Sequence, residues 1–360
     1  MTIQEKVPLA PLTTMQVGGE ARYFAEIKRE DELREAVSFA KSRDLPLFIL
    51  GGGSNLVIAD SGWPGLVLRI AIGGITTPEM NAATANDAKS TAVLFSVGAG
   101  VNWDDFVAQA VTQNCAGVEC LSGIPGSVGG TPVQNVGAYG QEVSDTVESV
   151  RAYDLQQDRF VILPKPACGF RYRSSVFNRT ERGRYIILRV NYRLKRGGAP
   201  SLKYADLQNY FAVQLAEKKM PLLAETRDAV RAIRRSKGML IVPGDEDCRS
   251  AGSFFKNPVL SEEQFKELSD RAAAQGLSIP SYPALDAQHK VSAAWLVEHS
   301  GFSKGYVAGA AGISKRHALA IINRGDAKAS DIVELKKEIQ DQVKARWEIL
   351  LEPEPVFVGF

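Results

Sequence analysis

Residues 169–178, GFRYRSSVFN, contain two arginines that could bind an anionic group. Arg171 and Arg173 flank Tyr172, so on a strand both guanidinium groups would point to the same face. An arginine held in a pocket donates two parallel hydrogen bonds to a carboxylate. The spacing alone fits a solvated strand face equally well.

Residues 250–258, SAGSFFKNP, place Ser253 near aromatic, lysine and asparagine side chains. Ser253 lacks Gly-x-Ser-x-Gly surroundings, and the chain has few histidines that could activate it, so a hydrolase nucleophile is disfavoured. In a dry site its hydroxyl could instead donate a proton to a strongly basic acceptor. For the segment alone, a capping hydroxyl and a solvated Lys256 explain the same residues.

Two carboxylates, Glu352 and Glu354, lie in the apolar, proline-punctuated end of the chain, LEPEPVFVGF. A charge in such a segment either points to water or serves a purpose inside the protein, and the sequence does not separate the two. Tyr204, in SLKYADL, is by itself an ordinary aromatic residue in a turn.

Three glycine-rich segments follow expected strands, at residues 51–55 (GGGSN), 98–100 and 117–140 (GVECLSGIPGSVGGTPVQNVGAYG). Turns rich in glycine let the backbone approach a ligand closely, and their N–H groups form anion sites. GGGSN is neither a Walker loop nor a dinucleotide fingerprint, and alone it is more often a tight turn. A long dinucleotide that crosses several loops would explain all three segments.

The periodicity of apolar residues predicts the elements that position these segments. The cluster Arg231, Arg234, Arg235 and Lys237 is expected to form an anion-contacting helix end, with Gly238 as the C-cap. Residues 76–90 read as a polar loop or linker. We expect strands over residues 21–27, 45–50, 66–70, 93–97, 147–153, 160–163 and 185–194, and helices over residues 29–44, 102–110, 224–237, 261–272, 292–299 and 330–349.

Length and composition indicate a globular protein of two or three domains, with 360 residues, 45% apolar residues and a net charge of +2. This balance supplies no basic face for nucleic acid. The N-terminus does not resemble a secretory signal, and no stretch is long and apolar enough to span a membrane. The scattered cysteines are expected to be cytosolic free thiols, and His289, His299 and His317 do not have metal-ligand spacing, so we expect no metal site.

The chain closely resembles the UDP-N-acetylenolpyruvoylglucosamine reductases, flavoenzymes of peptidoglycan precursor synthesis. The match follows the whole chain in order, through GGGSN, GAG, GIPGSVGGTPVQNVGAYG, FRYRSSVF, AGSFFKNP and LEPEPVF. The resemblance implies an α+β fold: a two-part FAD-binding module, made of a small α/β unit and a larger mixed-sheet unit, and a third, α/β substrate-binding domain. The boundaries we expect are residues 1–76, 77–236 with the tail 346–360, and 237–345.

The resemblance also implies residue roles. Arg173, Ser253 and Glu354 match the catalytic positions, and Tyr172, Tyr204, Lys237 and Asn257 are the expected substrate-binding residues. Tyr204 matches a substrate-capping tyrosine that is present in one branch of the family. The expected contacts to non-covalent FAD come from Gly51, Gly52, Gly53, Ser54, Asn55, Gly100, Ser127, Gly129, Gly130, Thr131, Gln134, Asn135, Gly137 and Arg234.

The implied reaction is reduction of FAD by NADPH, followed by hydride transfer to the enolpyruvyl ether of a UDP-sugar. Arg173 would stabilise charge on the substrate carboxylate, Glu354 would orient that carboxylate, and Ser253 would deliver a proton. We expect a cytoplasmic protein, monomeric and without membrane insertion. Pro355 and Val356 replace a Val-Arg pair of one branch, so no flavin contact from that arginine is implied, and residues 238–249 form a longer segment than in that branch.

Two alternatives remain at this point. One is an FAD-dependent oxidase or dehydrogenase of a sugar or alcohol on the same fold. Because no histidine precedes His289, a covalent histidyl link to flavin in the N-terminal half is excluded. The other is a nucleotide-binding regulatory module without catalysis, which gives no reason for Arg173, Ser253 and Glu354 to occur together.

Overall fold

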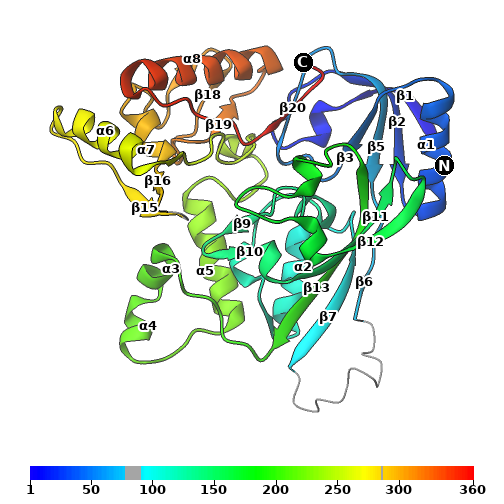
Figure 1. Ribbon diagram of the computed structural model, residues 1–360, viewed down its shortest axis with the longest axis horizontal. Coiled ribbons are helices and arrows are strands. Elements are labelled where there is room, and N and C mark those ends of the chain that lie inside the picture. Colours follow the sequence, from blue (N-terminus) through cyan, green and yellow to red (C-terminus); the bar gives the residue numbers. More distant parts are fainter. Residues whose placement is uncertain (78–90, 285–286) are drawn as a thin grey trace. The chain divides into compact units, whose positions relative to one another are not determined.

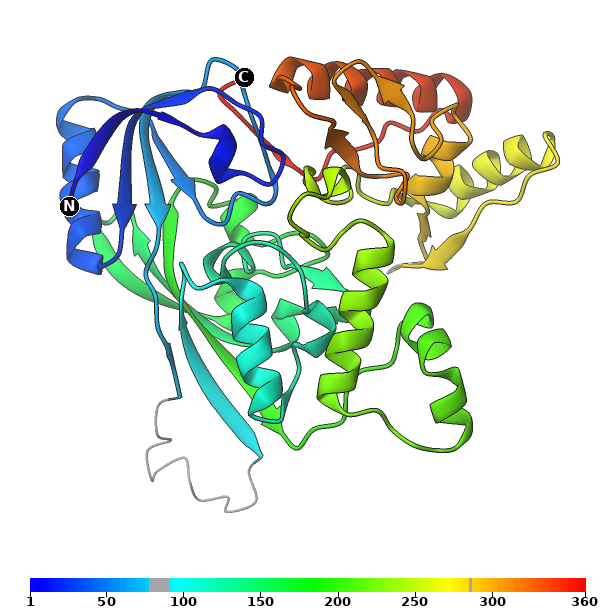
Figure 2. The ribbon, with the colours of Figure 1, turned by 180° about the vertical axis from the view of Figure 1, so that it is seen from behind.

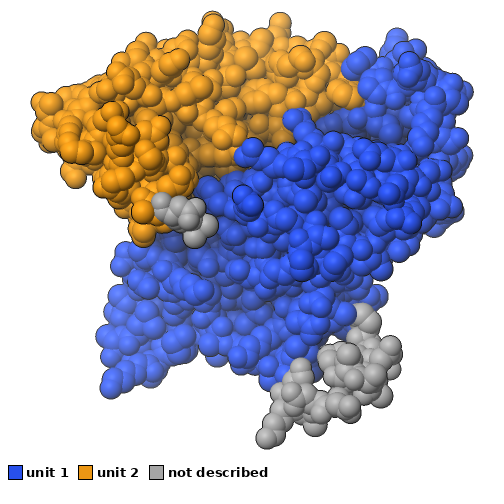
Figure 3. Space-filling model, viewed as in Figure 1, with its two compact units in different colours: residues 1–6, 22–52, 64–236 blue, residues 7–21, 53–63, 237–360 orange. Residues whose placement is uncertain are grey.

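The computed structural model describes residues 1–77, 91–284 and 287–360 (Figure 1). The chain divides into two compact units (Figure 3). Unit 1 contains residues 1–6, 22–52 and 64–236, and unit 2 contains residues 7–21, 53–63 and 237–360. The tail 346–360, which we expected to join the second subdomain, belongs to unit 2 with residues 237–345. The three-domain division stays a prediction, and most of the expected polar segment 76–90 lies outside the described residues.

Unit 1 begins with a sheet in the order β1-β2-β5-β3, in which β3 and β5 are parallel and pair Leu47 with Leu66. Helix α1 buries the face formed by Leu33, Val37 and Ala40, the spacing that predicted it. Strand β3 ends directly before the GGGSN turn, as expected, and β4 follows that turn. The elements are β1 (Ile3–Pro8), β2 (Glu20–Ile27), α1 (Glu30–Ser42), β3 (Leu47–Leu50) and β5 (Trp63–Ile70).

The larger sheet of unit 1 has the order β12-β11-β13-β7-β6 and is antiparallel. The long central strand β13 pairs Val190 with Val150 of β11 and with Val97 of β7. Helices α2 and α5 lie side by side (Figure 2). The elements are β6 (Ile75–Thr76), β7 (Ala92–Gly98), α2 (Trp103–Thr112), β8 (Cys115–Ala116), β9 (Gly137–Ala138), β10 (Gln141–Glu142), β11 (Val147–Asp154), β12 (Arg159–Pro164), β13 (Tyr185–Arg196), α3 (Ala205–Tyr210), α4 (Ala212–Ala216) and α5 (Leu223–Ser236).

Two helix boundaries of this unit follow from the residues that cap them. The Asn102 side chain accepts hydrogen bonds from the amides of Asp104 and Asp105, which begins α2 as predicted. Gly238, expected to end α5, has φ +66° just beyond Ser236. The backbone conformation at both ends is therefore the one that these residue types favour.

The described residues of unit 2 form three small sheets and three α-helices around their own apolar core. Strand β20 near the C-terminus pairs in parallel with β4, with Val358 opposite Ile58, so the apolar tail packs back on the protein as expected. Ser261 and Gln264 form the predicted capping box of α6. The elements are β4 (Leu56–Ile58), β14 (Val259–Leu260), α6 (Glu262–Ala273), β15 (Ser281–Pro283), β16 (His289–Val291), α7 (Ala293–Glu298), β17 (Val307–Ala308), β18 (Ala311–Ile313), β19 (Ile321–Asn323), α8 (Ala329–Trp347) and β20 (Val356–Val358).

Helix and sheet are thus mixed in both units, in agreement with the expected α+β class. Within the described part of the chain, no helix is long and apolar enough to cross a membrane.

Candidate active site

Gly51 and Gly52, at the start of the GGGSN turn, approach the glycine-rich loop 117–140 closely within unit 1. A methyl group at Gly52 would come within 2.5 Å of Gly126 Cα and 2.7 Å of Ser127 N. A methyl group at Gly129 would lie 2.6 Å from the Ala99 side chain, and the Gly129 amide donates to the Ala99 carbonyl at 2.9 Å. Glycine is required here because neighbouring segments of the protein touch at these positions.

In the same loops the Ser127 hydroxyl is buried, and the space beside Gly130 is open. A Cβ built on Gly100 would lie 2.5 Å from Ala71 Cα, so this glycine is closely packed. A Cβ on Gly130 would meet no atom within 4 Å among the described residues. Ser127 Oγ is buried and has no hydrogen-bond partner in the described part of the protein, and it lies 2.9 Å from a Cβ built on Gly51. A buried hydroxyl without a protein partner needs an acceptor or donor from elsewhere. These positions fit a polar cofactor.

Other residues expected at the cofactor are engaged within the protein. The Thr131 hydroxyl donates to the Val128 carbonyl at 2.8 Å and lies 2.8 Å from the Tyr192 hydroxyl of β13. Gly137 begins β9, and a Cβ there would crowd Glu142 at 2.8 Å. These contacts fix the shape of the loop. Thr131 and Gly137 as direct ligands of FAD stay predictions, as does the half-buried Gln134.

Asn135 joins the glycine-rich loop to the arginine segment. Its amide nitrogen donates to the Glu142 carboxylate at 2.7 Å and to the Arg171 carbonyl at 3.1 Å, while its amide oxygen accepts from Ser144 N at 3.1 Å. Asn135 is 1% exposed and has φ +46°, a conformation that asparagine tolerates better than most residues. The side chain therefore acts as a buried brace between the two segments.

The arginine segment is a tight turn, not a strand, the conformation in which the spacing would place both arginines on one face. Arg171 N donates to the Ser174 carbonyl at 2.9 Å, and Ser174 N donates back to the Arg171 carbonyl at 3.0 Å. Arg173 has φ +51°, so the alternation of a strand does not hold and the two arginines do not share a strand face. The Arg173 guanidinium lies 5.9 Å from the ring centre of Tyr172, which is 44% exposed.

Hydrogen bonds on both sides hold the turn in this conformation. Ser175 Oγ donates to the Val133 carbonyl of the glycine-rich loop at 2.6 Å. The Asn178 amide donates to the Arg173 carbonyl at 3.3 Å. A non-glycine residue with positive φ is uncommon and persists where its surroundings determine the backbone, often at functional sites. The position of Arg173 is thus set by the loop on which the turn rests.

Arg234, the expected flavin contact on α5, is buried against the same loop. Its Nε donates to the Gly123 carbonyl at 3.0 Å, and burial lowers the pKa of its guanidinium while Tyr139 and Asp104 oppose that shift. Asp104 of α2 accepts from Gly123 N at 2.6 Å and pairs with arginines of α5. This part of the glycine-rich loop is therefore clamped between two helices.

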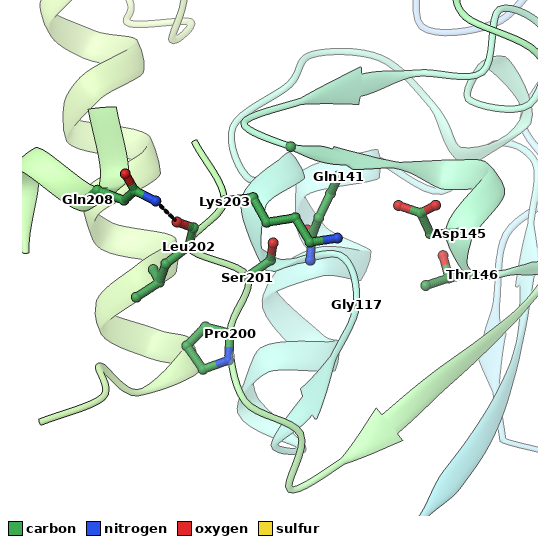
Figure 4. Close-up of a pocket in the computed structure, with 10 residues that line it drawn as sticks. Gly117, Gln141, Asp145, Thr146, Pro200, Ser201, Leu202, Lys203 and Gln208 are labelled. Carbon is green, nitrogen blue, oxygen red and sulfur yellow. Dashed lines mark hydrogen bonds between the residues drawn. The ribbon is translucent and has the colours of Figure 1, made fainter. Parts of the chain in front are cut away.

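Tyr204, the expected capping residue, follows a segment that a buried carboxylate holds in place. Glu119 is fully buried and accepts from Gly117 N at 2.7 Å, Gln141 Nε2 at 2.8 Å and Ser201 N at 2.9 Å. A cavity of about 570 Å³ lies between residues 200–203 and the pair formed by Asp145 and Thr146 (Figure 4). Tyr204 itself is 44% exposed and packs edge to face on Tyr139, with ring centres 5.4 Å apart.

Ser253 lies beside a histidine in unit 2. Its Oγ is 2.9 Å from Nε2 of His317, although 64 residues separate the two along the chain. The sequence motifs did not point to this neighbour, because the two residues are far apart along the chain and only the fold brings them together. A serine and a histidine at this distance meet the first geometric condition for proton transfer through the hydroxyl.

The segment after Ser253 pairs with the tail that carries Glu354. Glu354 N donates to the Phe254 carbonyl at 2.8 Å, and Lys256 N donates to the Glu352 carbonyl at 2.9 Å. The Lys256 ammonium is also 2.6 Å from the Glu352 carboxylate, so this lysine is ion-paired and not simply solvated. The tail and the serine segment form one backbone framework.

Two further expected site residues, Asn55 and Gly53, lie close to this framework or in the turn before it. Asn55 donates to the Glu354 carbonyl at 3.3 Å and accepts from Val356 N at 2.9 Å, so it fixes the tail on both sides of Pro355. Gly53 has φ +65°, and a Cβ there would lie 2.0 Å from the Leu12 carbonyl oxygen.

The other residues of unit 2 that we expected to bind substrate or cofactor are Asn257, Ser54 and Lys237, and their contacts differ. Asn257 accepts from Ala293 N at 3.0 Å, which anchors the start of α7. The carbonyl of Ser54 accepts a long hydrogen bond of 3.4 Å from the Thr14 hydroxyl. Lys237 follows α5 and is half-buried. Their ligand roles remain predictions. Within the residues that the structure describes, no three His, Cys, Asp or Glu side chains converge as metal ligands would.

Comparison with known proteins gives one consistent result. Residues 243–358 match the model of the UDP-N-acetylenolpyruvoylglucosamine reductase C-terminal domain, and residues 21–158 match that of an FAD binding domain. The chain is 43% identical over 357 residues to the UDP-N-acetylenolpyruvoylglucosamine reductase of Thermobifida fusca, which covers 98% of this chain and 97% of the relative. It is 42% identical to the Streptomyces coelicolor enzyme of that name, over 98% of this chain and 89% of the relative.

A solved structure agrees with these relatives. The crystal structure of UDP-N-acetylenolpyruvylglucosamine reductase from Thermus caldophilus aligns with a TM-score of 0.65 and 26% identity, over 99% of this chain and 100% of the other. The similarity therefore extends over both units and over the segments that carry the candidate residues.

Proposed function

The chain belongs to the UDP-N-acetylenolpyruvoylglucosamine reductase family, and we propose that it reduces the enolpyruvyl ether of UDP-N-acetylglucosamine to UDP-N-acetylmuramate at the expense of NADPH. This reaction belongs to peptidoglycan precursor synthesis. The proposal is carried by one observation: Ser253, with its histidine neighbour, and Glu354 lie on two hydrogen-bonded segments of one framework. The 43% identity to the Thermobifida fusca reductase, over 98% of this chain, supports the proposal.

The glycine loops are suited to hold FAD. The buried Ser127 hydroxyl, which has no hydrogen-bond partner among the described residues, and the open side of Gly130 fit a polar cofactor, with Gly51 nearby. FAD held by these loops would supply the hydride-transfer chemistry that links NADPH to the substrate. Asn135 and Thr131 would stabilise the conformation of the loop, since their side chains form hydrogen bonds within the protein.

Arg173 stabilises the negative charge that develops on the substrate carboxylate when the hydride arrives at the carbon distal to it. A guanidinium matches a carboxylate in shape and donates two hydrogen bonds, and such donors act most strongly in a closed, dry site. The tight turn anchored by Asn135 and Ser175 fixes the backbone that carries this guanidinium, which limits the reorganisation needed during the reaction.

Ser253 gives its hydroxyl proton to the carbon next to the carboxylate, which completes the saturated ether. Glu354 orients the substrate carboxylate, in its protonated form or through a water molecule, because two bare carboxylates repel each other. Lys237, Asn257, Tyr172 and Tyr204 bind the remainder of the substrate in this proposal, with Tyr204 as a cap over it.

Several finer features belong to the same proposal. FAD is held without a covalent link, and the FAD-binding module consists of two subdomains followed by a substrate-binding domain. The protein works as a monomer in the cytoplasm. The family resemblance supports these statements.

Product analysis tests the proposed reaction. The purified protein is incubated with NADPH and the enolpyruvyl sugar nucleotide. The products are separated, and their masses are measured by mass spectrometry. We expect NADPH-dependent formation of UDP-N-acetylmuramate, which carries two more hydrogen atoms than the substrate. Oxygen consumption with a sugar or alcohol, and no conversion of the sugar nucleotide, would instead indicate an oxidase on the same fold.

A further inference from the structure

The hydroxyl of Ser253 has a defined neighbour in His317. Ser253 Oγ and His317 Nε2 lie 2.9 Å apart within unit 2, and both residues are partly buried. None of the motifs in the sequence pointed to His317. The contact is a hydrogen bond in which the histidine tautomer decides which partner donates.

The backbone fixes the two residues relative to each other. Phe254 N donates to the Leu319 carbonyl at 2.8 Å, which joins the serine segment to the chain just after His317. His317 N donates to Ser314 Oγ at 3.2 Å, and Ala320 N donates to the His317 carbonyl at 3.1 Å. His317 therefore lies in a hydrogen-bonded turn, residues 314–320, and the bond between Phe254 and Leu319 holds this turn next to the serine segment.

A serine hydroxyl has one proton, and its direction decides whether the serine can act as an acid. If Ser253 donated to His317, that proton would point away from the substrate. If His317 Nε2 carries a proton and donates it to Ser253 Oγ, the serine proton is free to point at the reacting carbon. Only the second arrangement is compatible with Ser253 as a proton donor.

We propose that His317 is a positioning residue that donates a hydrogen bond from Nε2 to Ser253 Oγ and so directs the serine proton to the substrate. This inference rests on the proposed function. The carbon–carbon double bond becomes a single bond, one carbon gains the hydride and the other gains the Ser253 proton. The oxygen of Ser253 is left negative, the Nε2–H group stabilises it, and water returns the proton before the next turnover.

A donor at this position can be supplied by an amide as well as by an imidazole. His317→Gln places an NH₂ group where it can reach Ser253, whereas His317→Leu fills a similar volume without any donor. A purely structural role would be met by either substitution that preserves packing, and a role as a base that takes up the serine proton would be met by neither. The two variants therefore separate a hydrogen-bonding neighbour of Ser253 from a packing residue and from a base.

The test is anaerobic stopped-flow spectroscopy of the FAD-loaded protein. NADPH bleaches the flavin in the first half-reaction, and the enolpyruvyl sugar nucleotide restores its colour in the second. We expect His317→Leu to slow only the second half-reaction, by about 10²-fold, as for loss of one preorganised donor. His317→Gln should stay within about tenfold of the unmodified protein in this half-reaction. His299→Leu, which removes a histidine bonded to its own helix at Trp295, should change neither half-reaction.

Each other outcome is decisive. If His317→Gln is as slow as His317→Leu, the imidazole accepts the proton or acts by its charge. If His317→Leu is as fast as the unmodified protein, no donor is needed. Either result overturns the proposal. Should His317→Leu fail to bind FAD, His317→Asn, whose amide is too short to reach Ser253, replaces it. If the unmodified protein itself is bleached and not recoloured by the sugar nucleotide, the proposed function fails, and not this inference alone.

Discussion

The backbone amide of Glu354 donates a hydrogen bond to the carbonyl oxygen of Phe254 at 2.8 Å, which places the residue after Ser253 directly beside the C-terminal tail. Phe255 and Pro353 form a second bridge between the same segments. Two residues about a hundred positions apart thereby share one rigid support. A catalytic group is held most precisely when its neighbours lock the backbone that carries it.

Ser253→Ala should separate the two half-reactions. Loss of a positioned proton donor costs about 10²–10⁴-fold in rate. We expect flavin reduction by NADPH to stay unchanged and the substrate-dependent reoxidation to slow by that factor, measured in single-turnover mixing. Ser261→Ala is the control, since it removes a serine hydroxyl that caps α6 at Gln264 N. Equal slowing of both half-reactions in Ser253→Ala would refute the assignment of Ser253 as the acid.

Asn135→Ala should destabilise unit 1 and disturb the Arg173 turn. The substitution removes partners from Glu142, Arg171 and Ser144, and losing buried hydrogen bonds of this kind costs about 3 kcal/mol of unfolding free energy. Urea denaturation measures this cost, and reoxidation by substrate should slow more than reduction by NADPH.

Asn114→Ala is the matched control for this brace. Asn114 also has positive φ, +54°, but its side chain is exposed, so its replacement should cost only about 1 kcal/mol of backbone strain. If both variants lose the same stability, the effect of Asn135 is conformational and the brace contributes nothing.

Asp104 should make stability depend on pH in the acid range. Burial raises the pKa of Asp104, but hydrogen bonds from Arg227 and Gly123 N and the charge of Arg231 lower it more, so the net pKa is below the ordinary value. A carboxyl with a lowered folded-state pKa stabilises the protein above its unfolded pKa of about 3.9, and this contribution is lost as the pH falls toward the folded-state pKa.

The measurement compares urea midpoints of Asp104→Asn with those of the unmodified protein. We expect the variant to lose about 2 kcal/mol at pH 7, since hydrogen bonds to charged groups contribute that much, and the difference to shrink as the pH is lowered below about 5. Asp105→Asn, at the exposed neighbouring position on α2, should cost less than about 1 kcal/mol at pH 7. A stability difference that stays constant over this pH range would contradict the account.

Glu119→Gln should weaken the contact between the glycine-rich loop and the segment before Tyr204. Both carboxylate oxygens accept hydrogen bonds, so an amide would place its NH₂ group against a backbone or side-chain donor. We expect a loss of about 2–3 kcal/mol in unfolding free energy and faster proteolysis around residues 198–204. The exposed Glu148, paired with Arg193, provides the control, because Glu148→Gln should change stability by less than about 1 kcal/mol.

The helices and strands were largely predictable because their apolar residues recur with the period of the element. The face of α1 with Leu33 and Val37 and the cap at Asn102 are local signals, and the structure confirms both. The FAD-related loops were recognisable from glycine content, although Gly52 and Gly129 turn out to serve close contacts between backbone segments.

The conformation of Arg173 and the neighbour of Ser253 could not be predicted in this way. The turn at Arg173 depends on hydrogen bonds from Asn135 and Ser175, and no local pattern encodes bonds to a distant loop. His317 reaches Ser253 only because the chain between them folds into sheets and helices. Non-local contacts of this kind require the fold itself.

The central claim is that this protein passes electrons from NADPH through FAD to an enolpyruvyl sugar nucleotide. It is tested most directly by recording the flavin absorption band under anaerobic conditions during sequential addition of the two substrates. The account predicts bleaching by NADPH and full recovery on adding the sugar nucleotide. Bleaching without recovery would contradict the substrate assignment, and a protein that binds no FAD even when it is supplied would contradict the role given to the glycine loops.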